Sequence, residues 1–530
     1  MMKDNYRVAK YTGIVMIATI LCRILGLGRE IAISNLFGSG METDAFFIAF
    51  MIPNLLRSFL GEGALNTTFI PIFSEHLAQK NQKSADYFAS NVLNILLITL
   101  VIITVSGILG APWIVNIIAN GFQNQTDKFA LTVQLTRIMF PYIFFVAIAA
   151  MFMGILNTYR SFFIPAFAPA MLNISIIILA FFYASHWGIY SLGIGVLLGG
   201  MAQMLIHIPS LIRKQFHYRL FVDLSDPGIQ KFFHLLLPAI LGLGITKINV
   251  VVDRIIASFL VNGSISALYF ANRLMQFPLG VFGIALSIAI LPTLSFHFAK
   301  NNFDKLKDSF SFGLKMLSLS TVPSTIGLIV LSQPIIRLFY EHGRFNAQDT
   351  SMTVHALVYY ALGLFAVATL RLVTSTFYSL QDTRTPLKIG SLIVIINIIL
   401  DLLLVQYMAH AGIALATSLS AIINLTLLGM ALHKKVPGMF SQKFIPFFLK
   451  ILSISLVMGF GCWFSSFYLG QMLDLSVKIN QVAQVFLSIL IGLFFYLTGG
   501  KLLGISEFKN IRYTIRKLIK GKINEDKQSD

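Results

Sequence analysis

Long apolar segments follow one another from end to end of the chain, separated by short polar stretches. Each is at least as long as the roughly 20 residues that an α-helix needs to cross a bilayer. Of the 530 residues, 56% are hydrophobic and only 12% are charged, a balance typical of membrane proteins. The pattern predicts an all-α polytopic membrane protein of about fourteen transmembrane helices. The predicted spans are 11–37, 43–76, 86–118, 130–156, 163–184, 189–212, 230–260, 264–298, 309–331, 351–379, 386–407, 412–432, 445–468 and 479–503.

Positive charge is divided unevenly between the loops on the two sides of these spans. Lysine and arginine gather at the N-terminus, in every second loop and in the tail, whereas the opposite loops hold only Lys128, Arg337, Arg344 and Lys478. Because loops rich in lysine and arginine stay in the cytoplasm, we expect both termini to be cytoplasmic. This topology also accounts for the net charge of +18, so we expect no nucleic-acid partner.

An internal repeat relates two parts of the chain at one constant spacing. Residues 69–78 (FIPIFSEHLA) match residues 290–299 (ILPTLSFHFA), a spacing of 221 residues that we call the repeat offset. Pro165 aligns with Pro386 at the same offset. A spacing of six helices preserves orientation, so the repeats are parallel, and transporter substrates bind between such halves. We therefore expect four parts, namely a six-helix half at 1–222, a second six-helix half at 223–440, two additional helices at 441–506 and a basic cytoplasmic tail at 507–530. The tail fits either an amphipathic helix on the inner leaflet or a solvated segment.

Arginines interrupt the apolar spans, although one charge at membrane depth costs about 2.5–3.5 kcal/mol on insertion. Arg23 and Arg29 lie in the first span, Arg57 in the second and Arg273 in the eighth. At 1.5 Å per residue, Arg23 and Arg57 lie roughly 21 Å from the outer helix ends, and Arg29 and Arg273 roughly 12–14 Å. The four cations can therefore meet in two layers of one central cavity.

Two interpretations of these arginines remain open. Glu30, Asp44 and Glu62 are the nearby carboxylates, and ion pairs with them would lock the helices together. A guanidinium also binds phosphate through two parallel hydrogen bonds and stays charged when buried. The excess of cations over carboxylates favours an anion site.

A second polar set lies in other spans. Asn397 and Asp401 are four residues apart and share a helix face, and Asp253 and Thr417 reach a similar predicted depth. Two carboxylates, an amide and a hydroxyl suit a hard cation such as Na⁺. The alternative pairs Asp253 with a basic neighbour on its own helix and leaves Asp401 merely polar.

Several strings around these residues resemble a known family. They are CRILGLGRE, FGSGMETDAFFIAFMIPNLLRSFLGEGALNTTFIPIFSE, ILNTYRSFFIPAFAPAMLNI, ALYFANRLMQFPLGVFGIAL and FYSLQDTRTPLKI. They are similar to the MviN/MurJ lipid II flippases of the multidrug/oligosaccharidyl-lipid/polysaccharide exporter superfamily, over essentially the whole chain. The resemblance implies a transporter of the bacterial cytoplasmic (inner) membrane, not an enzyme, that moves undecaprenyl-pyrophosphate-linked peptidoglycan precursor outward.

The resemblance also implies roles for individual residues. The four arginines would be required cavity cations, and Asp44 and Ser266 fall on family motif positions. Some relatives carry acids where Asn272 and Gln276 stand, so a salt-bridge gate at that place is in doubt here. The expected substrate-binding residues are Arg23, Arg29, Arg57, Arg273, Asp44, Ser266, Glu62 and Gln276. Some members carry a sodium site at the positions of Asp253, Asn397, Asp401 and Thr417, and in the family the last two helices border a groove for the lipid tail.

We therefore expect a flippase that works by alternating access, with lipid II and membrane lipids as partners. The cell-wall synthesis machinery is a further candidate partner, and the chain is expected to function as a monomer. Two sources of energy for the return to the inward-facing state remain open, namely the membrane potential and Na⁺ at the second polar set, and no other cofactor is expected. The alternatives are an exporter of another undecaprenyl-linked oligosaccharide, or a MATE-like cation-coupled exporter, which a cationic cavity disfavours. A membrane glycosyltransferase or phosphatase would need catalytic residues in sizeable loops, and these loops are short.

Overall fold

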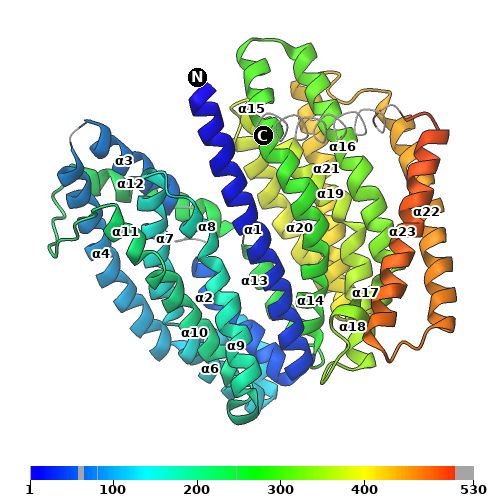
Figure 1. Ribbon diagram of the computed structural model, residues 1–530, viewed down its shortest axis with the longest axis horizontal. Coiled ribbons are helices and arrows are strands. Elements are labelled where there is room, and N and C mark those ends of the chain that lie inside the picture. Colours follow the sequence, from blue (N-terminus) through cyan, green and yellow to red (C-terminus); the bar gives the residue numbers. More distant parts are fainter. Residues whose placement is uncertain (1, 58–64, 80, 246, 506, 508–530) are drawn as a thin grey trace, which may run out of the picture. The chain divides into compact units, whose positions relative to one another are not determined.

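The computed structural model describes residues 2–57, 65–79, 81–245, 247–505 and 507, and over these ranges the chain forms helices and no strand (Figure 1). The prediction of an all-α membrane protein is therefore confirmed. Glu62 and the tail beyond Glu507 lie outside the described residues, as do the predictions made for them.

The first half of the chain contains eleven α-helices and one 3-10 turn among its described residues. Proline occupies the first turn of α5, α9 and α11, where its missing N–H is not needed and its fixed φ suits a helix start. The elements are α1 (Met2–Phe37), α2 (Met41–Arg57), α3 (Leu65–Gln79), α4 (Gln82–Leu109), α5 (Ala111–Ile118), η2 (Asn120–Asn124), α6 (Thr126–Met139), α7 (Tyr142–Thr158), α8 (Phe163–Phe167), α9 (Pro169–Trp187), α10 (Tyr190–Leu205) and α11 (Ile208–Arg213).

The second half continues with further helices and one π-helical turn, η3, which follows Pro278 in the middle of a long apolar stretch. The elements are α12 (Pro227–Ile245), α13 (Ile248–Ala257), α14 (Ser264–Pro278), η3 (Leu279–Ile284), α15 (Ala285–Ala299), α16 (Phe303–Val330), α17 (Ser332–Phe339), α18 (Ala347–Leu362), α19 (Leu364–Ser379), α20 (Arg384–Met408), α21 (His410–Lys435), α22 (Phe444–Met472) and α23 (Lys478–Leu502).

Ten helical stretches of the described residues are long and apolar enough to cross a membrane, and α18 with α19, bent by 41°, would make eleven. These eleven correspond to eleven of the predicted spans. The other three predicted spans, 11–37, 43–76 and 230–260, include residues or side chains outside the described set. The count of fourteen and the cytoplasmic location of both termini therefore stay predictions.

The helix bounds recur at the repeat offset that the sequence predicted. Helices α4 and α16 correspond at both their first and their last residue, and each has 28 residues. Asn81 and Asn302 cap these two helices, each accepting a backbone N–H three residues further on. The same offset relates α5 to α17 at both ends, and the corner at Gly188 (φ +52) to the corner at Ala409 (φ +48). Two copies of one helical pattern therefore occur in the chain.

Close packing divides the chain differently, into two compact units. The first comprises Met1–Phe270 with Tyr340–Met352, and the second comprises Ala271–Phe339 with the chain from Thr353 onward. Helix α12, which follows the predicted boundary at residue 222, packs on α3 and α4 of the first unit. The boundaries at 222 and 440 stay predictions that concern the repeat rather than the packing.

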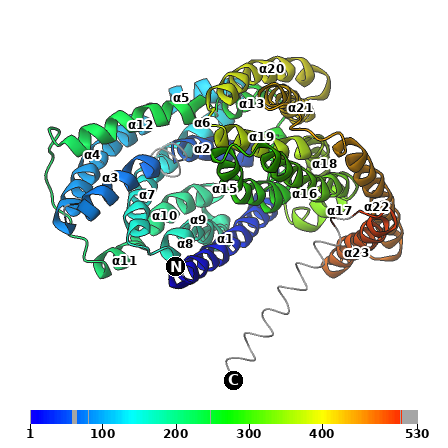
Figure 2. The same cartoon turned by 90° about the horizontal axis from the view of Figure 1, so that it is seen from above.

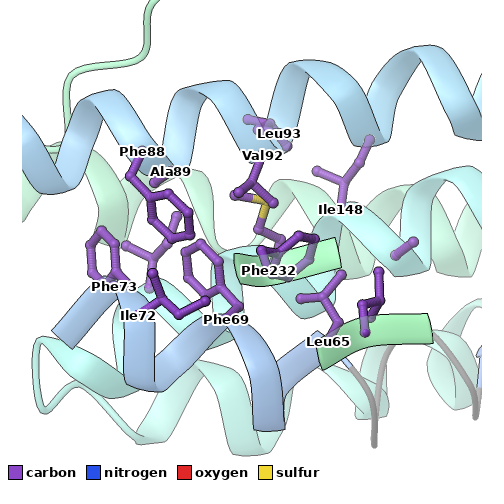
Figure 3. Packing of buried hydrophobic residues seen from close by; sticks show 14 of the residues in the cluster. Leu65, Phe69, Ile72, Phe73, Phe88, Ala89, Val92, Leu93, Ile148 and Phe232 are labelled. Carbon is purple, nitrogen blue, oxygen red and sulfur yellow. The ribbon is translucent and has the colours of Figure 1, made fainter. Parts of the chain in front are cut away.

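An aromatic core fixes one end of α4 in the first unit. Phe69 and Phe73 of α3 stack on each other, and Phe88 of α4 stacks on Phe69 with ring centroids 5.7 Å apart (Figure 3). Ile148 of α7 and Phe232 of α12 belong to the same buried cluster. These contacts hold the N-terminal half of α4 against three neighbouring helices.

In the second unit, the two C-terminal helices α22 and α23 lie side by side, and α22 packs along α16 (Figures 1 and 2). Leu319 and Val322 of α16 are buried against Ile451 and Met458 of α22. Tyr496 of α23 donates a hydrogen bond of 2.7 Å to the backbone carbonyl of Leu319.

Candidate functional site

A buried carboxylate with four donors forms a polar centre of the first unit. Asp44, in the first turn of α2, is fully buried. Its Oδ1 accepts the backbone N–H and the hydroxyl of Ser266, at 2.9 and 2.7 Å. Its Oδ2 accepts the backbone N–H of Gly263 at 2.8 Å and the ammonium of Lys128 at 2.9 Å. The carboxylate therefore binds the N-terminal end of α14, where a helix favours negative charge.

Lys128, which the pattern of spans assigned to an outer loop, lies instead in a helix and belongs to this centre. It is the third residue of α6, only 1% exposed, and its ammonium also donates to Asn262 at 2.7 Å. The ammonium stands 4.1 Å from the ring centroid of Phe122, close enough for a cation–π contact. Counting loop charges could not reveal this burial, but the repeat offers a signal, because the counterpart of Lys128 in the second copy is the buried Asp349.

Gly263 makes the approach to Asp44 possible. Its φ of +92° is a conformation that residues with a Cβ rarely adopt, and a Cβ here would lie 2.7 Å from the carbonyl oxygen of Ser39. The Ser39 hydroxyl in turn donates to the Gly263 carbonyl at 3.2 Å. The turn before α14 therefore presents its N–H groups to Asp44 because its backbone is held on both sides.

Arg29 has partners of its own in the first unit. Its guanidinium donates to Glu30 at 2.5 Å and to the Tyr269 hydroxyl at 3.1 Å, and Tyr269 also donates to Glu30 at 3.0 Å. Arg29 and Glu30 are both buried, and the Tyr269 ring stacks on Phe47 with centroids 3.8 Å apart. This arrangement is the ion pairing that the sequence left open as an alternative for Arg29. One donor of Arg29, the buried Nε, has no hydrogen-bond partner among the described residues.

Arg23 and Arg57 occupy different environments in the first unit. Arg23 is exposed on α1, fourteen residues before that helix ends at Phe37. Arg57 is the last residue of α2, half-buried, and its Nε donates to Asn54 at 3.0 Å. Because α2 begins at Met41, Arg57 lies about 24 Å along the helix at 1.5 Å per residue.

Arg273 belongs to the second unit, near the end of α14. It is half-buried, and Gln276 beside it is exposed and donates to Asn272, four residues earlier. The expected meeting of Arg273 with the other arginines in one cavity stays a prediction.

The four residues expected to bind Na⁺ are also divided between the units. Asn397 and Asp401 are both buried, and with Ile393 they form the buried stripe of α20 at a spacing of four residues. Thr417 of α21 is half-buried and donates to the Ile413 carbonyl at 3.0 Å. Asp253 is half-buried on α13 in the first unit. The pairing of Asn397 with Asp401 on one buried face agrees with their spacing, and the Na⁺ site itself stays a prediction.

Comparisons with known proteins agree with one another. The family model described as "Lipid II flippase MurJ" matches residues 33–483 of this chain. A relative from Buchnera aphidicola, named "Probable lipid II flippase MurJ", is 32% identical over 500 residues, which are 93% of this chain and 96% of the relative.

Solved structures extend this finding to the fold. The structure titled "Lipid II flippase MurJ, inward closed conformation" is 33% identical, with a TM-score of 0.77, and covers 92% of this chain and 99% of that one. An inward-facing multidrug resistance MATE family transporter of the MOP superfamily has a TM-score of 0.67 over 79% of this chain and 95% of its own, but at 15% identity it shows the fold alone. The chain belongs to the MurJ family of lipid II flippases.

Proposed function

We propose that this chain moves lipid II, the undecaprenyl-pyrophosphate-linked peptidoglycan precursor, from the inner to the outer leaflet of the bacterial cytoplasmic membrane. The observation that carries the proposal is the family match over residues 33–483, together with a relative that aligns over 96% of its length. A flippase carries its substrate across the membrane without changing a covalent bond, so the protein is a transporter and not an enzyme.

The arginines supply the anion chemistry that a diphosphate requires. Arg23 is exposed and Arg57 and Arg273 are half-buried, so none of the three residues is fully enclosed. The buried Nε of Arg29 supports a part for this residue as well, because a buried donor without a partner costs about 1–3 kcal/mol. In this proposal the diphosphate takes that donor during transport while Glu30 keeps the other side of the guanidinium.

Asp44 and Ser266 have a different part. All four hydrogen bonds to the Asp44 carboxylate come from the protein itself, and the Ser266 hydroxyl is one of the donors. These two residues therefore hold the beginning of α2 against the beginning of α14, and they reach the substrate only if that centre opens.

Depletion of the protein in its own cells tests the substrate. We expect lipid II to accumulate on the cytoplasmic side, and accumulation of another lipid-linked oligosaccharide with lipid II unaffected would overturn the assignment. Complementation with Arg23→Ala or Arg273→Ala should fail although the variants reach the membrane. Arg344→Ala is the matched control, because Arg344 is exposed and only 3.7 Å from an exposed Glu42.

The same proposal assigns Na⁺ to Asp253, Asn397, Asp401 and Thr417. The buried Asn397 and Asp401 support it, because their amide and carboxylate lie on one face of α20 and are oxygen ligands of the kind that a hard cation prefers. We expect the melting temperature to rise in NaCl relative to KCl, and Asp401→Ala to abolish that rise. Asp382→Asn, at a carboxylate outside the spans, should retain it, and an unmodified protein indifferent to Na⁺ would overturn the assignment.

A further inference from the structure

The segment between α11 and α12, residues 216–226, is an extended strap bound along α4. Asn94 of α4 donates to the backbone carbonyls of Arg219 and Phe221, at 2.8 and 2.7 Å. Asn91 exchanges two hydrogen bonds with the backbone of Asp223, at 2.7 and 2.9 Å. Side chains of α4 therefore hydrogen-bond the backbone of the strap, as the backbone of a neighbouring strand does in a β-sheet.

Two further residues of α4 complete this attachment. Ser90 accepts the Arg219 N–H at 3.1 Å, and Asp86 accepts the N–H of His217 at 3.2 Å. The bonded backbone groups belong to every second residue of the strap, which fixes its register on the helix. Among the described residues, Leu220, Val222 and Leu224 make no hydrogen bond to α4. The Tyr218 hydroxyl does donate to Asn94 at 2.5 Å, although the residue stays 46% exposed.

Those other residues form an exposed apolar row. Tyr218, Leu220, Val222 and Leu224 are all exposed, and Leu220 is 85% exposed. His217 and Arg219 are exposed as well, but from Leu220 to Leu224 exposed and half-buried residues alternate, as is typical of an extended segment with one covered and one open face. Four large apolar side chains in succession on an open face indicate a contact outside the described chain.

The position of the strap on α4 identifies that contact. Tyr87, Asn91 and Asn94 lie on one stripe of α4, and the strap covers it. The same stripe continues, at helical spacing, through the exposed Ile98, Val101, Val105 and Leu109, which face lipid in a span of mean hydropathy 2.7. The strap therefore lies on the lipid-facing side of α4, directly beside the start of the lipid-exposed surface.

The charges of the neighbourhood suit the same partner. Arg213, Lys214 and Arg219 are exposed on or just before the strap. The carboxylates of the two acids of the strap are hydrogen-bonded to the protein, since Asp223 accepts from the Tyr87 hydroxyl and Asp226 accepts from the Gly228 N–H. An apolar row flanked by cations is the composition that binds at an anionic membrane interface.

We propose that the strap is a membrane-surface binding element, with Tyr218, Leu220, Val222 and Leu224 inserted among lipid headgroups and Arg213, Lys214 and Arg219 on anionic phosphates. This site includes none of the residues assigned to the substrate and goes beyond the proposed transport function. It anchors the connection between α11 and α12 to the leaflet on its own side, which the positive-inside rule predicts to be cytoplasmic.

Fluorescence quenching on the full-length protein tests the proposal. Leu220→Cys, in a background with Cys22 and Cys462 replaced by alanine, carries an environment-sensitive label in reconstituted vesicles. Ser225→Cys, exposed on the same strap outside the apolar row, is the matched control. We expect nitroxide lipids labelled near the headgroup to quench the label at 220 several-fold more than the label at 225, and aqueous iodide to show the reverse order.

Two outcomes would overturn the proposal. Free quenching of both labels by iodide, without lipid quenching, would make the row a solvated surface. Protection of the label at 220 from both quenchers would mean that a polypeptide covers the strap edge instead.

Further variants test separately the contribution of the three cations and the attachment of the strap to α4. Replacing Arg213, Lys214 and Arg219 by glutamine should lower lipid quenching in vesicles containing phosphatidylglycerol but not in pure phosphatidylcholine. Equal effects in both lipids would contradict a role for anionic headgroups. Asn94→Ala should detach the strap and raise iodide quenching at 220, and an unchanged profile would show that α4 does not hold the row in place.

Discussion

Helices α4 and α16 hold counterpart positions in the two copies of the repeat, have equal length and follow equivalent asparagine caps, yet their surroundings differ. Val101 of α4 is 51% exposed, whereas its counterpart Val322 is 5% exposed. Ile98 and Leu319 differ in the same way, at 53% and 7%. In the second copy the helices α22 and α23 occupy the face that the first copy leaves to lipid and the strap.

The polar residues of the two copies diverge further. Asn91 and Asn94, which bind the strap, correspond to Phe312 and Lys315 of α16. Lys315 instead pairs with Glu507 at 2.8 Å, beyond the end of α23. One helical pattern therefore supports two kinds of attachment, and the local side chains decide which segment each copy accepts.

The largest loss of stability should come from breaking the buried ion pair of Asp44 with Lys128. The second copy lacks this pair because Ile265 stands at the counterpart of Asp44. Lys128→Met leaves Asp44 buried without its cation, and breaking a buried pair costs about 3–5 kcal/mol. We expect a large fall in melting temperature, measured in detergent or nanodiscs. Arg344→Met removes a cation from an exposed pair and should shift it little. Similar shifts for both variants would contradict the importance of burial.

The two valines test the packing difference directly with the same substitution. Val322→Ala opens space between α16 and α22 and should cost about 1–2 kcal/mol. Val101→Ala leaves a gap that lipid chains fill, so we expect almost no change in melting temperature. Equal losses would indicate that α4 is covered in the membrane by another protein surface.

The strap should respond locally when its helix attachment is removed. Asn94→Ala deletes two hydrogen bonds to the strap backbone and the one that Asn94 accepts from the Tyr218 hydroxyl, worth together about 1 kcal/mol once water replaces them. We expect faster hydrogen exchange over residues 217–223 and near-normal exchange in the rest of the first unit. Uniformly faster exchange would mean that Asn94 supports the whole unit rather than the strap.

The smallest effect concerns a loop ion pair found in the second copy. The Lys435 ammonium donates to Asp382 at 2.7 Å, and this contact together with the Thr385 N–H lowers the pKa of the Asp382 carboxyl. In the first copy Ser161 stands at the position of Asp382 and Lys214 at that of Lys435, so this pair is absent there. Because the folded-state pKa is depressed, the pair stabilises the fold above the ordinary pKa of about 3.9, and the effect is lost as pH falls through the folded-state value.

Lys435→Gln should therefore lower stability at neutral pH by up to about 1 kcal/mol, and the difference should disappear in strong acid. Lys214→Gln, at the counterpart position, should leave the melting temperature unchanged at both pH values. A loss from Lys435→Gln that persists in strong acid would show that the lysine acts through packing and not through its charge.

Apolar periodicity and the repeat offset predict the helices because both can be found from the order of residues along the chain. The ion pair of Asp44 with Lys128 could not be derived in this way, since the two residues are 84 positions apart and Lys128 lies where an outer loop was expected. The partners of Arg29 were among the alternatives but could not be chosen, because a neighbouring glutamate does not show which way it points. The strap was missed because its alternation is short and its anchors lie on another helix.

The corner at Ala409 shows that one copy of the repeat can indicate a stabilising substitution in the other. Its backbone, at φ +48° and ψ −132°, is nearly that of Gly188 in the other copy, at φ +52° and ψ −140°. Such a conformation costs a residue with a Cβ about 1–3 kcal/mol, whereas glycine adopts it readily. The first copy thus has glycine where the second has alanine, so Ala409→Gly is a candidate stabilising substitution that comes from the internal repeat and not from a related protein.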